Sequence, residues 1–294
     1  MSNSKITGTG SYIPTIVQEN SKFSNHQFLN ADGSKFDAAN DVIIEKFKSI
    51  TGIEERRYAS KDLLTSDIAY YSAVDAIKNS GVNPEELDYI ILAHNFGDVV
   101  RPAGQSDILP SLATRVKHKL QIANPNCVAY DILFGCPGWV EGVIQAQAFI
   151  KAGIAKKALV IGAETLSRVV DKSDRDSMIF SDGAGACIVE ATDENGSGIL
   201  SHATQTFAKE EANYLFFGKS FNTDANPEEK YIKMLGRKIY EFALSNVPQA
   251  MKVALDKSGI PIGEVKKIFI HQANEKMDEA IIKRFYRLYK TPTP

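Results

Sequence analysis

Cys136 lies in a setting that suits a nucleophile. It occupies the turn at 133–138 (LFGCPG), between an apolar run at 127–133 that predicts a buried strand and a helical pattern at 138–152. A thiol at a helix N-terminus faces unpaired N–H groups and the positive end of the helix dipole, which favour the reactive thiolate. A small core cysteine is the competing interpretation.

His271 is the second candidate for chemistry. It ends the apolar run 266–271, a predicted strand, and opens the motif HQAN. Open α/β sheets bind their ligands at the C-terminal ends of strands, although a histidine bonded to loop backbone is an equally simple interpretation. The Gly-rich stretch 180–186 lacks the Lys-Ser/Thr of a phosphate-binding loop and indicates close backbone packing or the approach of a substrate.

The other two cysteines, Cys127 and Cys187, lie within predicted strands and are expected in the core. The three cysteines have no CxxC spacing and are odd in number, so neither a structural zinc site nor a disulfide framework is predicted. The cytoplasm, a reducing compartment, is the simplest location for such a chain.

Alternating apolar runs and helical patterns must position these residues, and they predict an α/β protein. The predicted strands are 88–94, 127–133, 157–163, 184–190 and 266–271, and the predicted helices are 65–80, 138–152, 230–258 and 275–290.

The chain has 294 residues, 44% hydrophobic and 24% charged, with a net charge of −2. That balance excludes a protein dominated by nucleic-acid or anionic-membrane binding. No apolar run approaches the ~18 residues of a membrane span.

An internal similarity predicts a duplicated architecture. Residues 76–93 align without gaps on 254–271, at an offset of 178 positions, with five of 18 residues identical. Both segments read as helix, Ser-Gly turn and strand. We therefore expect an N-terminal half at 1–190 that carries the cysteine and a C-terminal half at 191–294 that carries the histidine. If each half spans about 178 residues, the second half would extend beyond residue 294, so it is expected to be incomplete.

Five motifs together resemble β-ketoacyl-acyl-carrier-protein synthase III, a thiolase-fold condensing enzyme. They are the stretches 8–14 and 51–56, Asp131 five residues before Cys136, the stretch 180–186 and the motif at 271–274. The resemblance implies a duplicated α/β fold in αβαβα layers, in agreement with the internal similarity. It also implies a homodimer that needs no metal or cofactor.

The resemblance implies a role for each candidate. Cys136 would take the acyl group of an acyl-CoA, and His271 would polarise the malonyl thioester of malonyl-acyl-carrier-protein as CO₂ leaves. The carbanion would attack the acyl-cysteine and release 3-ketoacyl carrier protein, which starts fatty-acid synthesis. A thiolate suits transthioesterification, and a neutral histidine donor stabilises a developing enolate oxygen.

The chain also departs from the family pattern. A third catalytic residue, an asparagine, would fall near position 301, and a Gly-rich oxyanion loop would also lie beyond the chain. Lys46 stands where many relatives have a tryptophan that stacks on CoA adenine, while Arg175 matches the arginine on the other side of that adenine. The segment 101–107 and Leu109 lie where a partner-subunit residue closes the acyl pocket, so the acyl length is left open.

The predicted helix at 275–290 has a basic face, comprising Lys276, Lys283, Arg287 and Lys290, with Arg284 beside them. Met277, Ile281, Phe285 and Leu288 form the opposite, apolar side. The resemblance matches Lys276, Lys283 and Arg284 to carrier-protein docking residues, and an ordinary solvated face is the alternative.

Three other functions compete with chain initiation. The chain could be a ketosynthase of a secondary lipid or polyketide pathway with a longer acyl donor. It could be a non-catalytic thiolase-fold partner subunit, or an unrelated Cys-His hydrolase. Release of CO₂ from a malonyl thioester would separate the condensing enzymes from the other two.

Overall fold

A computed structural model describes residues 3–100, 105–194 and 197–294. The chain divides into two compact units, each of which is discontinuous in sequence. Unit 1 comprises Met1–Val17, Arg57–Arg168 and Ser181–Leu200, and unit 2 comprises Gln18–Arg56, Val169–Phe180 and Ser201–Pro294. No helix of the described residues is both long enough and apolar enough to span a membrane.

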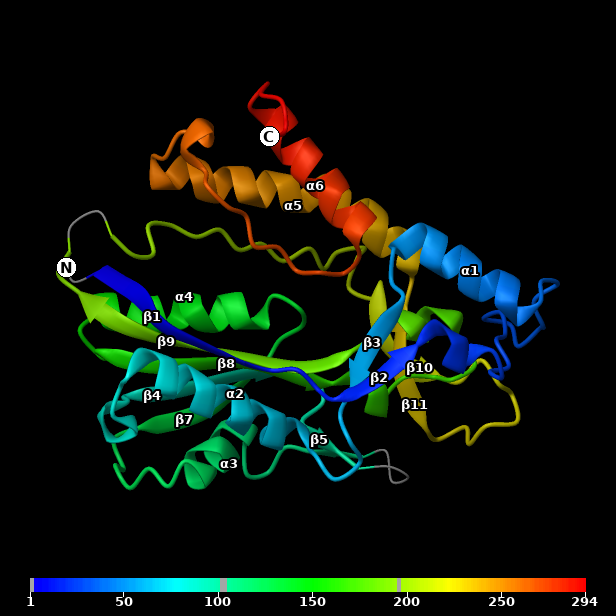
Figure 1. Ribbon diagram of the computed structural model, residues 1–294, viewed down its shortest axis with the longest axis horizontal. Coiled ribbons are helices and arrows are strands. Elements are labelled where there is room, and N and C mark those ends of the chain that lie inside the picture. Colours follow the sequence, from blue (N-terminus) through cyan, green and yellow to red (C-terminus); the bar gives the residue numbers. More distant parts are fainter. Residues whose placement is uncertain (1–2, 101–104, 195–196) are drawn as a thin grey trace. The chain divides into compact units, whose positions relative to one another are not determined.

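A five-stranded mixed sheet forms the centre of unit 1 (Figure 1). Its order is β1 (Asn3–Tyr12), β9 (Asp182–Thr192), β8 (Lys157–Thr165), β4 (Tyr89–His94) and β7 (Val128–Leu133). β8, β4 and β7 are parallel, whereas β9 runs antiparallel to both β8 and β1. The four strands predicted in this part of the chain and the mixed α/β class are confirmed. The C-terminal ends of β4 and β7 meet at one edge of the sheet, with His94 beside Leu133.

Helices cover both faces of this sheet. α2 (Thr65–Ser80) and α3 (Leu112–Lys119) pack on one face around a core that includes Ile68, Leu112 and Leu159. α4 (Gly138–Lys151) packs on the other face over Ile91 and Val160. Two small two-stranded sheets pair β2 (Ile16–Glu19) with β3 (Glu55–Tyr58), and β5 (Asp98–Val99) with β6 (Ser106–Asp107).

Gly8 and Gly10 permit the tight contact between β1 and α2. A Cβ built on Gly10 would lie 2.2 Å from the backbone nitrogen of Ala76 and 2.3 Å from the carbonyl oxygen of Ser72. No side chain fits in that space, so a glycine at this strand position lets the helix approach the sheet backbone directly.

Unit 2 is built mainly from helices. Its elements are α1 (Asn40–Thr51), β10 (Leu215–Lys219), β11 (Lys230–Met234), α5 (Gly236–Ser258) and α6 (Glu275–Leu288). α5 and α6 pack against each other through Ala243, Leu244, Met277 and Ile281. The predicted helix at 275–290 is confirmed to within two residues.

Two predictions for unit 2 are wrong. The helix predicted over 230–258 begins only at Gly236, because Lys230–Met234 instead pairs with β10 in an antiparallel hairpin. The strand predicted at 266–271 is an extended segment without a β-ladder, and Phe269 within it is 90% exposed. A strand needs a neighbour to satisfy its backbone N–H and C=O groups, and no described strand pairs with this segment.

Candidate active site

Cys136 lies in a tight turn between β7 and α4 of unit 1. Phe134 N–H donates to the carbonyl oxygen of His94 at 3.2 Å, and Gly138 N–H donates to that of Gly135 at 2.8 Å. A Cβ on Gly138 would lie 2.8 Å from the Cβ of Ala93, so the first turn of α4 rests directly on β4. Cys136 therefore lies between the C-terminal end of β7 and the N-terminus of α4, as the sequence predicted.

The three cysteines differ sharply in exposure. Cys136 is exposed, whereas Cys127 and Cys187 are buried. Burial raises the pKa of the Cys187 thiol to about 12, and burial also raises the pKa of Cys127. Both buried thiols are therefore protonated and inert at neutral pH, so Cys136 is the cysteine positioned to react with a substrate from solution.

A buried polar network holds the end of β7, five residues before Cys136. Asp131 Oδ2 lies 3.0 Å from His94 Nε2 and accepts a 2.7 Å hydrogen bond from Leu112 N–H. Asp131 Oδ1 accepts from Ala113 N–H, also at 2.7 Å. Because His94 Nδ1 accepts from Gly97 N–H at 3.0 Å, its Nε2 carries the proton and donates to Asp131. One carboxylate thus ties β7 to β4 and to the N-terminus of α3.

A second carboxylate, which is half-buried, lies on β8. Glu164 Oε2 accepts from the backbone N–H and the side-chain amide of Asn95, at 2.7 and 2.8 Å. Burial raises the pKa of Glu164, and these hydrogen bonds oppose the rise only in part. Glu164 therefore fixes the loop that follows β4, next to the network of His94. Neither role follows from the sequence, because the partners lie far apart along the chain.

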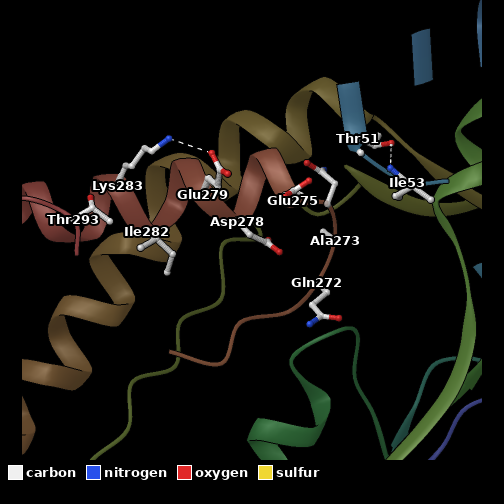
Figure 2. A pocket seen from close by; sticks show the side chains of 12 residues that line it. Thr51, Ile53, Gln272, Ala273, Glu275, Asp278, Glu279, Ile282, Lys283 and Thr293 are labelled. Atoms are coloured by element: carbon white, nitrogen blue, oxygen red, sulfur yellow. Dashed lines mark hydrogen bonds and ion pairs between the residues drawn. The ribbon is translucent and has the colours of Figure 1, made fainter. Parts of the chain in front are cut away.

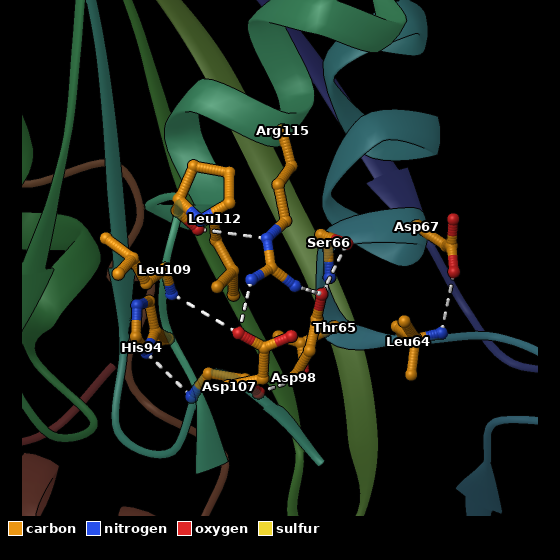
Figure 3. A network of polar contacts seen from close by, with 12 residues as sticks. Leu64, Thr65, Ser66, Asp67, His94, Asp98, Asp107, Leu109, Leu112 and Arg115 are labelled. Carbon is orange, nitrogen blue, oxygen red and sulfur yellow. Dashed lines mark hydrogen bonds and ion pairs between the residues drawn. The ribbon is translucent and has the colours of Figure 1, made fainter. Parts of the chain in front are cut away.

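Leu109 follows a hairpin that an arginine holds in place (Figure 3). The guanidinium of Arg115 binds Asp98 on β5 at 2.6 Å and Asp107 on β6 at 2.7 Å, and it also donates to the carbonyl oxygen of Pro110 at 3.0 Å. The hydrogen bond from Arg115 lowers the pKa of Asp107. Leu109 is 87% exposed. Residues 101–104 of the predicted pocket segment lie outside the described residues.

His271 lies in unit 2, in the exposed loop before α6. Ala273 N–H donates to the carbonyl oxygen of His271 at 3.0 Å, and the side chain of Asn274 caps α6 by accepting from Met277 N–H at 2.9 Å. The HQAN motif is therefore a turn followed by a helix cap, which fixes the histidine relative to α6. His271 thus belongs to unit 2, whereas Cys136 belongs to unit 1.

A cavity of about 580 Å³ lies beside this motif in unit 2. Figure 2 shows Asp278 pointing from α6 toward the loop of Gln272 and Ala273, with Lys283 on another side of the helix. Asp278 Oδ1 is buried and has no hydrogen-bond partner among the described residues. Burial raises the pKa of Asp278, and the charge of His271 opposes that rise. No motif in the sequence marks Asp278, although it lies only seven residues after His271.

The residues matched to CoA binding also lie in unit 2. Arg175 is exposed, and its guanidinium carbon lies 5.0 Å from the ring centre of Phe36. Lys46 is exposed on α1. The guanidinium of Arg175 is thus held against an aromatic ring, a cation–π arrangement.

The basic residues of α6 differ in their contacts. Lys283 is exposed and pairs with Glu279 at 3.1 Å, one helical turn away. Lys276 donates to the carbonyl oxygen of Ser49 on α1. Arg284 donates to the carbonyl oxygen of Leu244 on α5 at 2.9 Å. The predicted apolar side is confirmed, since Met277, Ile281 and Phe285 are buried.

Solved structures share this fold. The 3-oxoacyl-[acyl-carrier-protein] synthase III of Aquifex aeolicus VF5 is 31% identical, with a TM-score of 0.73 over 98% of this chain and 82% of that chain. The priming β-ketosynthase of the R1128 polyketide biosynthetic pathway has a TM-score of 0.80 at 23% identity, over 99% of this chain and 79% of that chain. At 23% identity, the similarity to the priming β-ketosynthase shows only that the two proteins share a fold.

Sequence relatives define the family. The family model of 3-oxoacyl-[acyl-carrier-protein (ACP)] synthase III matches residues 130–207. The β-ketoacyl-[acyl-carrier-protein] synthase III of Fusobacterium nucleatum is 33% identical over 95% of this chain and 80% of the relative. That of Neisseria meningitidis serogroup A is 34% identical over 96% of this chain and 81% of the relative. This chain belongs to the β-ketoacyl-[acyl-carrier-protein] synthase III family.

Proposed function

We propose that this chain catalyses the decarboxylative condensation of an acyl-CoA with malonyl-acyl-carrier-protein, giving 3-ketoacyl-acyl-carrier-protein and starting fatty-acid synthesis. Family membership supports the reaction class. The observation that carries the proposal is the exposure of Cys136 at the start of α4, while the other two thiols are buried. A reducing compartment such as the cytoplasm suits a reaction that depends on a thiol.

The first half-reaction is a transthioesterification. The Cys136 thiolate attacks the acyl-CoA carbonyl carbon, the C–S bond to CoA breaks, and the CoA thiolate takes up a proton as it leaves. The N-terminus of α4 supplies backbone N–H groups that favour the thiolate. The substrates supply every group that is transferred, so the proposal includes no cofactor and no metal.

The second half-reaction is the condensation. Malonyl-acyl-carrier-protein loses CO₂, and the electrons of the broken C–C bond form an enolate whose oxygen accepts a hydrogen bond from His271. The enolate carbon attacks the acyl-Cys136 thioester, and the thiolate leaves. The proposal assigns Cys136 to an N-terminal half at 1–190 and His271 to a C-terminal half at 191–294. It also includes a homodimer, in which Leu109 of one copy closes the acyl pocket of the other.

The carrier protein is proposed to dock on α6. Lys276, Lys283 and Arg284 lie on this helix, which follows directly after the HQAN motif. Carrier proteins are acidic, and a basic surface near the site entrance raises the association rate of such a partner. Lys283 is the residue best placed for direct contact, because it pairs only with the exposed Glu279 of its own helix, whereas Lys276 and Arg284 donate to backbone carbonyls of α1 and α5.

Mass spectrometry of the acylated protein tests the proposal. We expect incubation with acetyl-CoA to add one acetyl group to Cys136 and none to Cys127 or Cys187. The variant Cys136→Ala should take up no label. His271→Ala should keep the label but no longer release CO₂ from malonyl-acyl-carrier-protein. Label on Cys127 or Cys187 would refute the assignment of Cys136, and an unlabelled wild type that releases no CO₂ would favour a non-catalytic partner subunit.

A further inference from the structure

A lysine is buried in unit 2 with two aspartates. Lys233 on β11 is 2% exposed, and its Nζ lies 2.5 Å from Asp171 Oδ2 and 3.2 Å from Asp174 Oδ2. The same ammonium stands 3.3 Å from the ring centre of Phe221. Removing three charges from water is costly, and a buried ion pair is not by itself a source of stability. Stabilisation of the fold alone therefore does not account for this buried cluster.

Asp171 joins three chain segments at this point. Its Oδ1 accepts from Ser220 Oγ at 2.9 Å and from Ser173 N–H at 3.0 Å, and its Oδ2 accepts from Phe221 N–H at 2.8 Å. Burial alone would raise the pKa of Asp171, but the Lys233 ammonium and these N–H donors outweigh burial and lower it. Asp171 is thus a charged, fully bonded anchor for Lys233.

Asp174 extends the cluster to Arg175. While its Oδ2 binds Lys233, its Oδ1 accepts from Asp176 N–H at 3.0 Å and so caps the short helix η4 (Arg175–Ile179). Arg175 is the first residue of that helix. Its side chain is 48% exposed and lies 3.7 Å from the Asp176 carboxylate. The backbone position of Arg175 therefore depends on a carboxylate that Lys233 holds.

Phe36 fixes the other end of the Arg175 side chain. The ring of Phe36 packs against the buried residues Phe23, Phe28, Ile43 and Met178, and the guanidinium of Arg175 stacks on it. A flat guanidinium backed by an anchored ring is a surface on which a nucleobase can stack. Such a surface binds more tightly when it is rigid before the ligand arrives, because less side-chain entropy is lost.

We propose that the buried Lys233–Asp174 ion pair is a positioning device for Arg175, and that through it Lys233 sets the affinity for the nucleotide end of the CoA thioester. This inference rests on the proposed function, in which Arg175 contacts that nucleotide. Lys233 and Asp174 are positioning residues, because they act through Arg175 and do not touch the substrate.

Asp174→Asn is the test variant. It keeps an oxygen to cap η4 and breaks the ion pair, whereas loss of Lys233 would leave two buried aspartates without a counter-charge. Asp256→Asn is the control, the same change in an exposed ion pair of unit 2. Asp256 forms a 2.6 Å ion pair with Lys252, which also lies over an aromatic ring, that of Tyr289 at 4.5 Å. All variants are compared with acetyl-CoA and with S-acetylpantetheine, which lacks the nucleotide.

We expect Asp174→Asn to raise the KM for acetyl-CoA roughly fivefold, the equivalent of about 1 kcal/mol, and to leave the KM for S-acetylpantetheine within about twofold of wild type. Binding of adenosine 3′,5′-bisphosphate, measured by calorimetry, should weaken by a similar factor. Asp256→Asn should change none of these values. In an Arg175→Gln background, Asp174→Asn should add no further loss, because the two residues act as one unit.

An equal effect on both donors would show a purely structural role and overturn the inference. An unchanged affinity for adenosine 3′,5′-bisphosphate, or additive effects of the two substitutions, would also overturn it. If wild type is not acylated at Cys136 by either donor, the proposed function fails. In that case the affinity for adenosine 3′,5′-bisphosphate, compared between wild type and Asp174→Asn, still tests whether the ion pair positions Arg175, because this measurement does not depend on acylation.

Discussion

Asp131→Asn should destabilise the protein by more than its near-isosteric change suggests. Asp131 accepts three hydrogen bonds, from His94 Nε2, Leu112 N–H and Ala113 N–H, and its side chain is only 10% exposed. Asparagine has one oxygen instead of two. If that oxygen faces His94 and Leu112, the new amide group points its hydrogens at the N–H of Ala113.

The magnitude follows from these three bonds. Hydrogen bonds to a charged group contribute ~1.5–3 kcal/mol each and neutral ones ~0.5–1.5 kcal/mol. One bond is lost and its buried donor left unsatisfied, while the other two change from charged to neutral. We expect the free energy of unfolding to fall by about 3 kcal/mol. The end of β7 should loosen, so the turn of Cys136 should lose its alignment with the first N–H groups of α4.

Urea unfolding and alkylation by iodoacetamide measure the two effects. Alkylation should be slower in Asp131→Asn and should still occur at Cys136 alone, because the other thiols are buried. Asp88→Asn is the matched control. Asp88 lies at the opposite end of β4, and its Oδ2 accepts from Lys156 N–H and Lys157 N–H at 2.6 and 3.0 Å.

The control should lose only about 1 kcal/mol, because a single asparagine oxygen can keep both of its bonds. It should leave alkylation unchanged. Equal losses of stability in the two variants, or unaltered alkylation in Asp131→Asn, would refute the idea that Asp131 supports the turn of Cys136.

Three further predictions concern packing, charge and docking. Gly10→Ala should lower the unfolding free energy by about 3 kcal/mol, since its Cβ would lie 2.2 Å from Ala76 N. Gly185→Ala, with no described atom within 4 Å of its Cβ, should cost less than about 1 kcal/mol; similar costs for the two would contradict the packing argument. Burial raises the pKa of Glu164, so its contribution to stability is greatest below its unfolded pKa of about 4.3 and declines as the pH rises toward the folded pKa. Glu164→Gln should therefore gain stability relative to wild type as the pH rises above about 4.3, and parallel urea midpoints across the pH range would disprove this. Lys283→Glu should raise the KM for malonyl-acyl-carrier-protein, most strongly at low salt, without slowing the acylation of Cys136; an effect that does not depend on salt would argue against electrostatic docking.

Local patterns in the sequence determined the elements around Cys136. The apolar runs predicted β4, β7, β8 and β9, and Pro137 after the thiol marked the start of α4. The periodicity of 275–290 gave the buried side of α6. These features are local, because they depend on side-chain period and capping within a few residues. Motifs spread over the whole chain then indicated the family, which the relatives confirm.

Tertiary structure decided which distant residues meet. Asp131 finds its partners 37, 19 and 18 residues away, and Lys233 binds aspartates 62 and 59 residues away. Nothing in the residues next to Lys233 marks it as buried. The extended segment 266–271 was read as a strand from its apolar residues alone, yet a strand exists only where a second strand accepts and donates its hydrogen bonds. The spacing of apolar residues is a local property of the sequence and can be recognised in it directly. β-ladders and buried ion pairs instead require partners that only the folded chain brings together.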